Sequence, residues 1–264
     1  MTLPFFPPTD DPGPSFVDLL RRVQGSPPPV SVDSDMTITH GTTIVALRYA
    51  DGVVMAGDRR ATAGSSIAHR AMDKVHPADR WSGVAIAGAA GFALEMVKLF
   101  QLQLEHYEKV EGAVLSLEGK ANQLAIMVRQ NLPMAMQGLV VIPLFAGFDL
   151  RRRSGRIFTY DATGGRYEET DFHADGSGGR DARTAIKLQW RADMDRATAI
   201  ELAVEALYEA ADEDSATGGP DSVRGIYPTV ATITVEGYDP VLESEVAERF
   251  SDLIERKKQQ GLRP

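Results

Sequence analysis

Three polar side chains stand at the ends of apolar segments, where a rigid sheet could hold them for chemistry. Thr42 opens one strand-like run, Asp58 closes the next, and Lys74 follows shortly after. A threonine hydroxyl needs a base to remove its proton, and an α-amine with a pKa of about 8 suits that task. A buried lysine would lower the pKa of the hydroxyl, and an aspartate would keep that lysine charged. Each charge alone is typical of a solvated strand end, but the combination indicates an activated threonine.

The segment before Thr42 has a different composition from the rest of the chain. Residues 1–41 are rich in proline, aspartate, serine and threonine, which disfavour regular structure and burial. A cut between Gly41 and Thr42 would turn an unreactive amide into the α-amine that the chemistry needs. The segment is therefore either a disordered tail or a removable pro-segment.

Apolar periodicity indicates the elements that must position these residues. Residues 43–49 and 53–58 flank the turn Asp51-Gly52 and predict a hairpin. The spacing predicts two long helices that lie between other layers, a later helix and an apolar C-terminal face at 246–254. Two sheets with helices packed outside fit this order. The other predicted strands are 83–87, 140–149, 156–161 and 229–235, and the predicted helices are 92–110, 117–136 and 197–212.

Composition excludes several classes of function. The chain has 264 residues, a net charge of −9 and no cysteine, so nucleic-acid and anionic-membrane binding, disulfides and thiolate metal sites are disfavoured. No apolar run approaches the roughly 20 residues of a membrane span, and the start lacks a signal peptide. The five histidines show no ligand spacing, and there is no Walker A loop. We expect a cytoplasmic protein without metal or cofactor.

Two further segments carry unusual residues. Residues 212–214 place three acids at the end of a predicted helix, where the helix dipole disfavours negative charge, so at least one acid is expected to be there for its position. A calcium loop counted from Asp212 fails, because Ala216 and Val223 stand at ligand positions. The run 175–179 is rich in glycine and is typical of a surface turn.

Taken together, these segments resemble the proteasome β-subunit family, closest to its actinobacterial type. The resemblance spans nearly all of residues 42–235 and is specific in order and spacing. The segments that carry it are Gly41-Thr42-Thr43-Ile44-Val45, Ala56-Gly57-Asp58-Arg59-Arg60-Ala61-Thr62, Asp73-Lys74-Val75, Ala87-Gly88, Gly176-Ser177-Gly178 and Asp214-Ser215-Ala216-Thr217-Gly218.

The resemblance implies an α+β fold of the N-terminal nucleophile hydrolase type, a four-layer αββα sandwich of two antiparallel sheets between helix layers. It also implies that Thr42 is nucleophile and base, and that Asp58 and Lys74 tune its hydroxyl. The backbone N–H of Gly88 would face the oxyanion. Ser177 and Asp214 would hold the amino terminus and relay protons, together with Thr217, whose position often carries serine in the family.

By the same resemblance, residues 1–41 are a propeptide and 42–264 are the catalytic domain with a C-terminal helix and tail. Gly41 leaves room for Thr42 to attack the carbonyl before it, so we predict autocatalytic cleavage at Gly41-Thr42. The pocket for the substrate residue before the cut is apolar and favours an apolar side chain. Its predicted lining is Ala61, Thr62, Met72, Ile86 and Ala90.

The resemblance implies a threonine endopeptidase in a homo-oligomeric β-ring, stacked on α-subunit rings through which an ATPase regulator delivers unfolded polypeptides. Three alternatives stay open. The chain could be a non-catalytic ring subunit, although it keeps Thr42, Asp58 and Lys74. It could belong to a two-component ATP-dependent bacterial protease of the same fold, or act as a small-molecule amidase.

Overall fold

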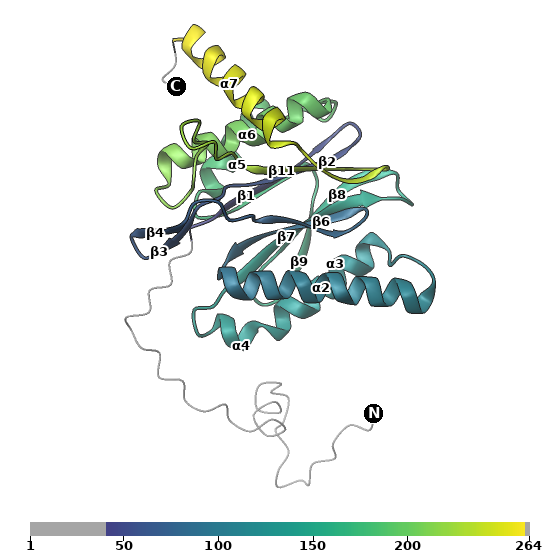
Figure 1. The fold of residues 1–264 in the computed structure, drawn as a ribbon. Coiled ribbons are helices and arrows are strands. Elements are labelled where there is room, and N and C mark those ends of the chain that lie inside the picture. Colours follow the sequence, from purple (N-terminus) through teal and green to yellow (C-terminus); the bar gives the residue numbers. More distant parts are fainter. Residues whose placement is uncertain (1–40, 262–264) are drawn as a thin grey trace, which may run out of the picture. The chain divides into compact units, whose positions relative to one another are not determined.

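The computed structural model describes residues 41–261, in which two five-stranded antiparallel sheets pack on each other (Figure 1). The predicted propeptide therefore lies outside the described residues apart from Gly41. The first sheet has the strand order β10 (Phe172–Gly176), β1 (Thr43–Tyr49), β2 (Gly52–Gly57), β11 (Thr229–Thr234) and β12 (Gly237–Pro240). The second has the order β5 (Val75–Asp79), β6 (Ser82–Gly88), β7 (Val141–Asp149), β8 (Ser154–Tyr160) and β9 (Arg166–Glu169).

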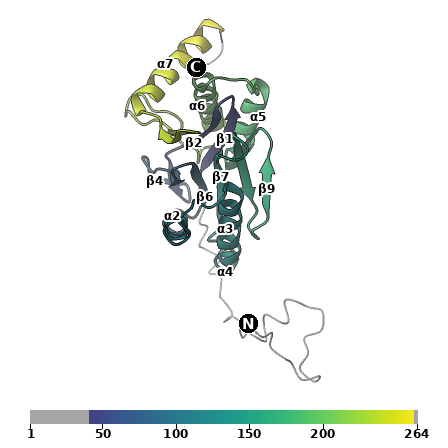
Figure 2. The ribbon, with the colours of Figure 1, turned by 90° about the vertical axis from the view of Figure 1, so that its right-hand side faces the viewer.

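Helices cover the outer face of each sheet, and both views place them on opposite sides of the sheet pair (Figure 1, Figure 2). One helix layer consists of α5 (Gly179–Gln189), α6 (Arg196–Glu213) and α7 (Glu243–Gln259). The other consists of α2 (Ala90–Glu111), α3 (Leu117–Gln130) and the short α4 (Leu132–Ala135). A two-stranded hairpin, β3 (Ala61–Ala63) and β4 (Ser66–His69), stands apart from both sheets. The predicted four-layer αββα sandwich is confirmed.

The continuous apolar strands follow from burial of both sheet faces. Ile44 and Ala46 belong to the core between the two sheets, whereas Val45 and Leu47 belong to the core between the first sheet and its helices. Successive side chains of a strand point to opposite faces, so a strand in an inner layer must be apolar at every position. The predicted hairpin is confirmed, with Ile44 paired to Gly57.

The helices on the second sheet differ from our prediction in two respects. They do not lie between layers of this chain: each packs on the sheet with one face and leaves apolar side chains exposed on the other, including Leu102 of α2 and Ile126 of α3. The helix predicted over 117–136 ends at Gln130, and α4 follows after Asn131. Pro133 explains the break, because it cannot donate to a carbonyl four residues back and its ring clashes with the preceding turn.

Some of the remaining elements match their predictions, and others were not predicted. Helices α2 and α6 and the strands β6, β7 and β8 match their predictions within about two residues, the usual uncertainty of such boundaries. The C-terminal face is confirmed, since Val246, Phe250 and Leu253 of α7 are buried in the core that α6 contributes to. The sequence interpretation missed α5, β5, β9, β10, β12 and the hairpin β3–β4. Among the described residues, no helix is both long and apolar enough to cross a bilayer.

Candidate active site

Thr42 lies at the start of β1, where pairing with β10 fixes its surroundings. Thr43 pairs with Gly176, which brings Ser177 beside Thr42. The Ser177 N–H donates to the Thr42 carbonyl at 2.8 Å, and the Thr42 N–H donates to Ser177 Oγ at 3.3 Å. Thr42 is only 5% exposed. The sheet therefore holds both the nitrogen and the carbonyl of this residue in place.

Lys74 and Asp58 form a buried ion pair next to Thr42, as their positions in the sequence indicated. Lys74 Nζ lies 2.5 Å from Asp58 Oδ1, and the two side chains are 3% and 0% exposed. Burial lowers the pKa of Lys74, while the charge and hydrogen bond of Asp58 oppose that shift. Lys74 Nζ also donates to the carbonyls of Arg60 at 2.6 Å and Gly41 at 3.4 Å. The ammonium is thus aimed at the peptide bond before Thr42.

Asp58 is held by backbone donors as well as by the lysine. The N–H of Thr43 donates to Asp58 Oδ1 at 2.7 Å, and the N–H groups of Arg60 and Gly218 each donate to Oδ2 at 2.9 Å. These bonds join the start of β1, the end of β2 and the loop after α6. Both oxygens of this buried carboxylate therefore have hydrogen-bond partners without solvent.

Of the three acids at the end of α6, Asp214 is the one that contacts the candidate site. Its Oδ2 accepts from Ser177 Oγ at 2.5 Å and from Thr217 Oγ1 at 2.6 Å, and its Oδ1 accepts from the Ala216 N–H. Burial raises the pKa of Asp214, but these hydrogen bonds outweigh it and leave the pKa below the usual range. Asp212 and Glu213, by contrast, are exposed. The acid expected to be there for its position is Asp214.

Thr217 connects this acid to the start of β1. It is fully buried, and its hydroxyl lies 2.5 Å from Thr43 Oγ1 as well as 2.6 Å from Asp214. The hydroxyl of Thr43 also accepts from the Gly178 N–H at 3.1 Å. The β-branched residue thus makes the hydrogen bonds that a serine would make.

We expect Thr217→Val to destabilise the fold more than Thr217→Ser, although valine conserves the volume better. Valine removes a buried hydroxyl with two partners, at a cost of about 1–3 kcal/mol. Serine loses only a methyl group, worth about 0.8 kcal/mol. Urea unfolding of the two variants measures the order. Greater stability of the valine variant would show that packing, and not hydrogen bonding, fixes this position.

The hydroxyl of Thr42 already lies against the bond that we predict it cleaves. Thr42 Oγ1 donates to the Gly41 carbonyl oxygen at 2.7 Å, within the uncut chain. The same oxygen accepts from Lys74 Nζ, and the Gly41 N–H donates to Thr62 Oγ1 at 3.0 Å. In this state the nitrogen of Thr42 is an amide and cannot act as a base.

One pocket borders Thr42, Lys74 and Gly41, and all five predicted pocket residues line it. They come from β3, β6, the first turn of α2 and the segment before β5: Ala61, Thr62, Met72, Ile86 and Ala90. Gly88 lines it too, with φ of 114°, and a Cβ there would lie 2.1 Å from the Val140 carbonyl oxygen. Only glycine fits this bend at the edge of the pocket.

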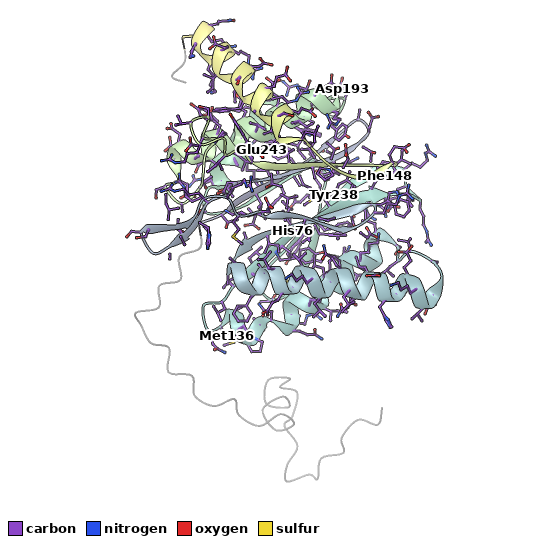
Figure 3. The ribbon with its side chains drawn as sticks, in the orientation of Figure 1. His76, Met136, Phe148, Asp193, Tyr238 and Glu243 are labelled. Carbon is purple, nitrogen blue, oxygen red and sulfur yellow. The ribbon has the colours of Figure 1, made fainter. Side chains whose placement is uncertain are left out.

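The sequence interpretation missed four further residues that line the pocket: Asp73, His76, Ala93 and Leu94. His76 lies on β5 and is labelled in Figure 3. It stands two residues after Lys74, and alternation along an extended segment puts both on one side, which was a usable signal. Burial lowers the pKa of His76.

Among residues 41–261, no group of three or more histidine or acidic side chains is placed to hold a metal ion.

Comparisons with known proteins add an independent observation. Residues 38–224 match the family model described as "Proteasome subunit". A protein of Acidimicrobium ferrooxidans named "Proteasome subunit beta" is 60% identical over 265 residues, which cover 100% of this chain and 97% of that protein. A protein of Streptomyces griseus with the same name is 59% identical over 84% of this chain and 79% of its own length. One of Acidothermus cellulolyticus, also so named, is 57% identical over 79% and 73%.

Proposed function

Because the chain belongs to the proteasome subunit family as a β-subunit, we propose that it is a threonine endopeptidase whose nucleophile is Thr42. The observation that carries the proposal is the position of the Thr42 hydroxyl, 2.7 Å from the Gly41 carbonyl oxygen and beside the buried Lys74–Asp58 pair. A buried charge pair whose lysine reaches the Gly41 carbonyl favours a catalytic subunit over a non-catalytic ring subunit.

The first reaction is release of the leader, which makes the chain a zymogen until then. Thr42 Oγ1 adds to the carbonyl carbon of Gly41, and in the resulting tetrahedral intermediate the Thr42 nitrogen is no longer an amide and takes up the hydroxyl proton. The C–N bond breaks, which leaves Gly41 esterified to the threonine side chain and the α-amine free. Water then hydrolyses the ester and releases residues 1–41 with a carboxylate at Gly41. Lys74, 3.4 Å from the carbonyl oxygen, stabilises the charge that develops there.

Hydrolysis of polypeptides uses the same hydroxyl with the freed amine as its base. The amine takes the proton of Thr42 Oγ1, and the oxygen attacks the substrate carbonyl to give an acyl-enzyme. The proton passes to the departing amine, and water completes the cycle. Ser177, hydrogen-bonded to Asp214, lies within reach of the amine. The N–H of Gly88, at the pocket edge, is proposed to bind the oxyanion.

As a proteasome β-subunit, the chain assembles with α-subunits into the rings of a core particle. The exposed apolar side chains on α2 and α3 fit burial in such an assembly, including Leu99, Leu102 and Val110. We propose a cytoplasmic particle that receives unfolded polypeptides from an ATPase regulator through the α-rings. The names of the relatives favour this assembly over a two-component protease or an amidase.

The assembled, processed particle is expected to prefer peptides with an apolar residue before the cut. Burial of a leucine side chain in the pocket is worth about 1.5–3 kcal/mol, so its kcat/KM should exceed that of a lysine peptide by about 10- to 150-fold. Fluorogenic peptides that differ only at this residue measure the ratio. No hydrolysis of any peptide by particles that begin at Thr42 would favour the non-catalytic subunit.

Met72→Glu should shift this preference toward lysine, because Met72 lines the pocket and is only half-buried. Ala71→Glu is the matched control, since Ala71 is exposed and is not among the lining residues. Equal shifts for the two variants would mean that the pocket does not select the substrate residue before the cut.

A further inference from the structure

The α-carbon of Gly41 lies against the loop that follows α6. A Cβ added to Gly41 would come within 2.2 Å of the Ala216 Cβ and 2.5 Å of the Ala216 carbonyl oxygen. Real Cβ atoms essentially never approach neighbours closer than 3.0 Å, so a side chain at residue 41 requires either Gly41 or Ala216 to move.

Ala216 is held on both sides and cannot retreat easily. The carbonyl of Ser215 accepts from Arg60 Nη1 at 2.7 Å, and the Ala216 N–H donates to Asp214 Oδ1 at 3.1 Å. On the other side, Thr217 is fully buried and bonded through its hydroxyl. Moving the loop would therefore disturb the hydrogen bonds that Asp214 accepts from Ser177, Thr217 and the Ala216 N–H.

Gly41 is held equally well in its position before the scissile bond. Its N–H donates to Thr62 Oγ1, and its carbonyl oxygen accepts from Thr42 Oγ1 and Lys74 Nζ. Moving Gly41 away from the loop would pull the carbonyl away from the hydroxyl that attacks it. Misplacement of reacting atoms by about 1 Å is enough to slow a reaction by about 100-fold.

The Cβ of a residue at position 41 would point away from the substrate pocket. An L-residue at position 41 would point its Cβ at Ala216, which is not among the residues that line the substrate pocket. The residue before the self-cleavage bond therefore cannot place its side chain in that pocket. Self-cleavage and peptide hydrolysis share a nucleophile, yet the walls that select the residue before the bond are different.

We propose that Ala216 is a specificity-determining residue of the self-cleavage step and restricts the residue before the scissile bond to glycine. This inference rests on the proposed function, because it concerns a reaction performed by Thr42. Ala216 acts only on the leader, because it is not among the residues that line the pocket for the substrate residue before the cut.

The test compares rates of leader release for Gly41→Ala, Ala216→Gly and the double variant, followed by intact mass during assembly with α-subunits. Gly41→Ala should slow leader release at least about 100-fold. Adding Ala216→Gly to Gly41→Ala should raise the rate of leader release at least about tenfold above that of Gly41→Ala alone. The rescue is partial because the carbonyl of residue 216 remains. Ala216→Gly alone should release its leader no faster than wild type, because Gly41 has no Cβ and there is no clash to relieve.

Ser215→Gly in the Gly41→Ala background is the control for loop flexibility, since it loosens the same loop without removing the Cβ that Gly41 faces. Equal rates for wild type and Gly41→Ala, no rescue by Ala216→Gly, or equal rescue by Ser215→Gly would each overturn the inference. Failure of the wild type itself to release its leader would instead contradict the proposed function, so the two failures are distinguishable.

Discussion

Thr42→Ala is expected to keep the Gly41–Thr42 bond intact in the assembled particle. The variant lacks the hydroxyl that lies 2.7 Å from the Gly41 carbonyl oxygen, while Lys74, Asp58 and Ser177 stay in place. Removal of a nucleophile slows an enzyme reaction by more than about 10³-fold, so no leader release should be detected within the time of assembly. Intact mass of the purified β-subunit measures it.

Thr42→Ser is the matched control, because serine keeps a hydroxyl at the same place. It should release the leader, with the mature chain beginning at residue 42, and should hydrolyse peptides more slowly than wild type or at a similar rate. A Thr42→Ala chain that still begins at residue 42 would show that another protease performs the cut. Self-processing would then be wrong even if the mature particle is active.

Lys74→Met is expected to lose both activity and stability. Asp58 is 0% exposed, and without the lysine its charge is left buried with backbone donors alone. Breaking a buried ion pair in this way costs about 3–5 kcal/mol. The hydroxyl of Thr42 also loses the ammonium near the bond it attacks, so kcat/KM should fall by at least about 10²–10⁴-fold. Urea unfolding and peptide hydrolysis measure the two effects.

The double variant Asp58→Asn with Lys74→Met separates the two roles of the pair. Asparagine removes the unpaired charge, so the double variant should regain part of the stability that Lys74→Met loses. The recovery is partial because the side-chain NH2 group replaces one of the two oxygens that accept backbone N–H groups. The double variant should not regain activity, because no ammonium is present. Recovery of activity together with stability would show that Lys74 only supports the fold.

The residues of the candidate site could be located from sequence because each stands at a local transition. Thr42, Asp58 and Lys74 interrupt apolar runs, and Asp214 is an acid at the unfavourable end of a helix. Such signals need no knowledge of distant contacts. The structure adds the hydrogen bonds around them, above all the one between the hydroxyls of Thr43 and Thr217, which lie 174 positions apart in the chain.

The parts that were missed depend on tertiary contacts. Helix α5 begins at Gly179 inside a glycine cluster that indicates a turn, and only Ala182 and Ile186 are large enough to mark its buried face. The strand β10 gains its identity from pairing with β1, which no local pattern shows. Likewise, nothing local predicts that Ala216 faces Gly41. The contact between Gly41 and Ala216, on which the proposed selection of glycine rests, exists only in the folded chain.

The central claim, that Thr42 attacks polypeptide substrates only after its amine is freed, is tested most directly by trapping the acyl-enzyme. Processed wild-type particles and unprocessed precursor subunits are treated with a peptide-like β-lactone, which acylates hydroxyl nucleophiles, and are digested and mapped by mass. We predict one adduct on the processed subunit, on the peptide that begins at Thr42, with stoichiometry that matches the loss of peptidase activity. We predict no adduct on the precursor. An adduct at another residue, or full inhibition without modification of Thr42, would contradict the central claim.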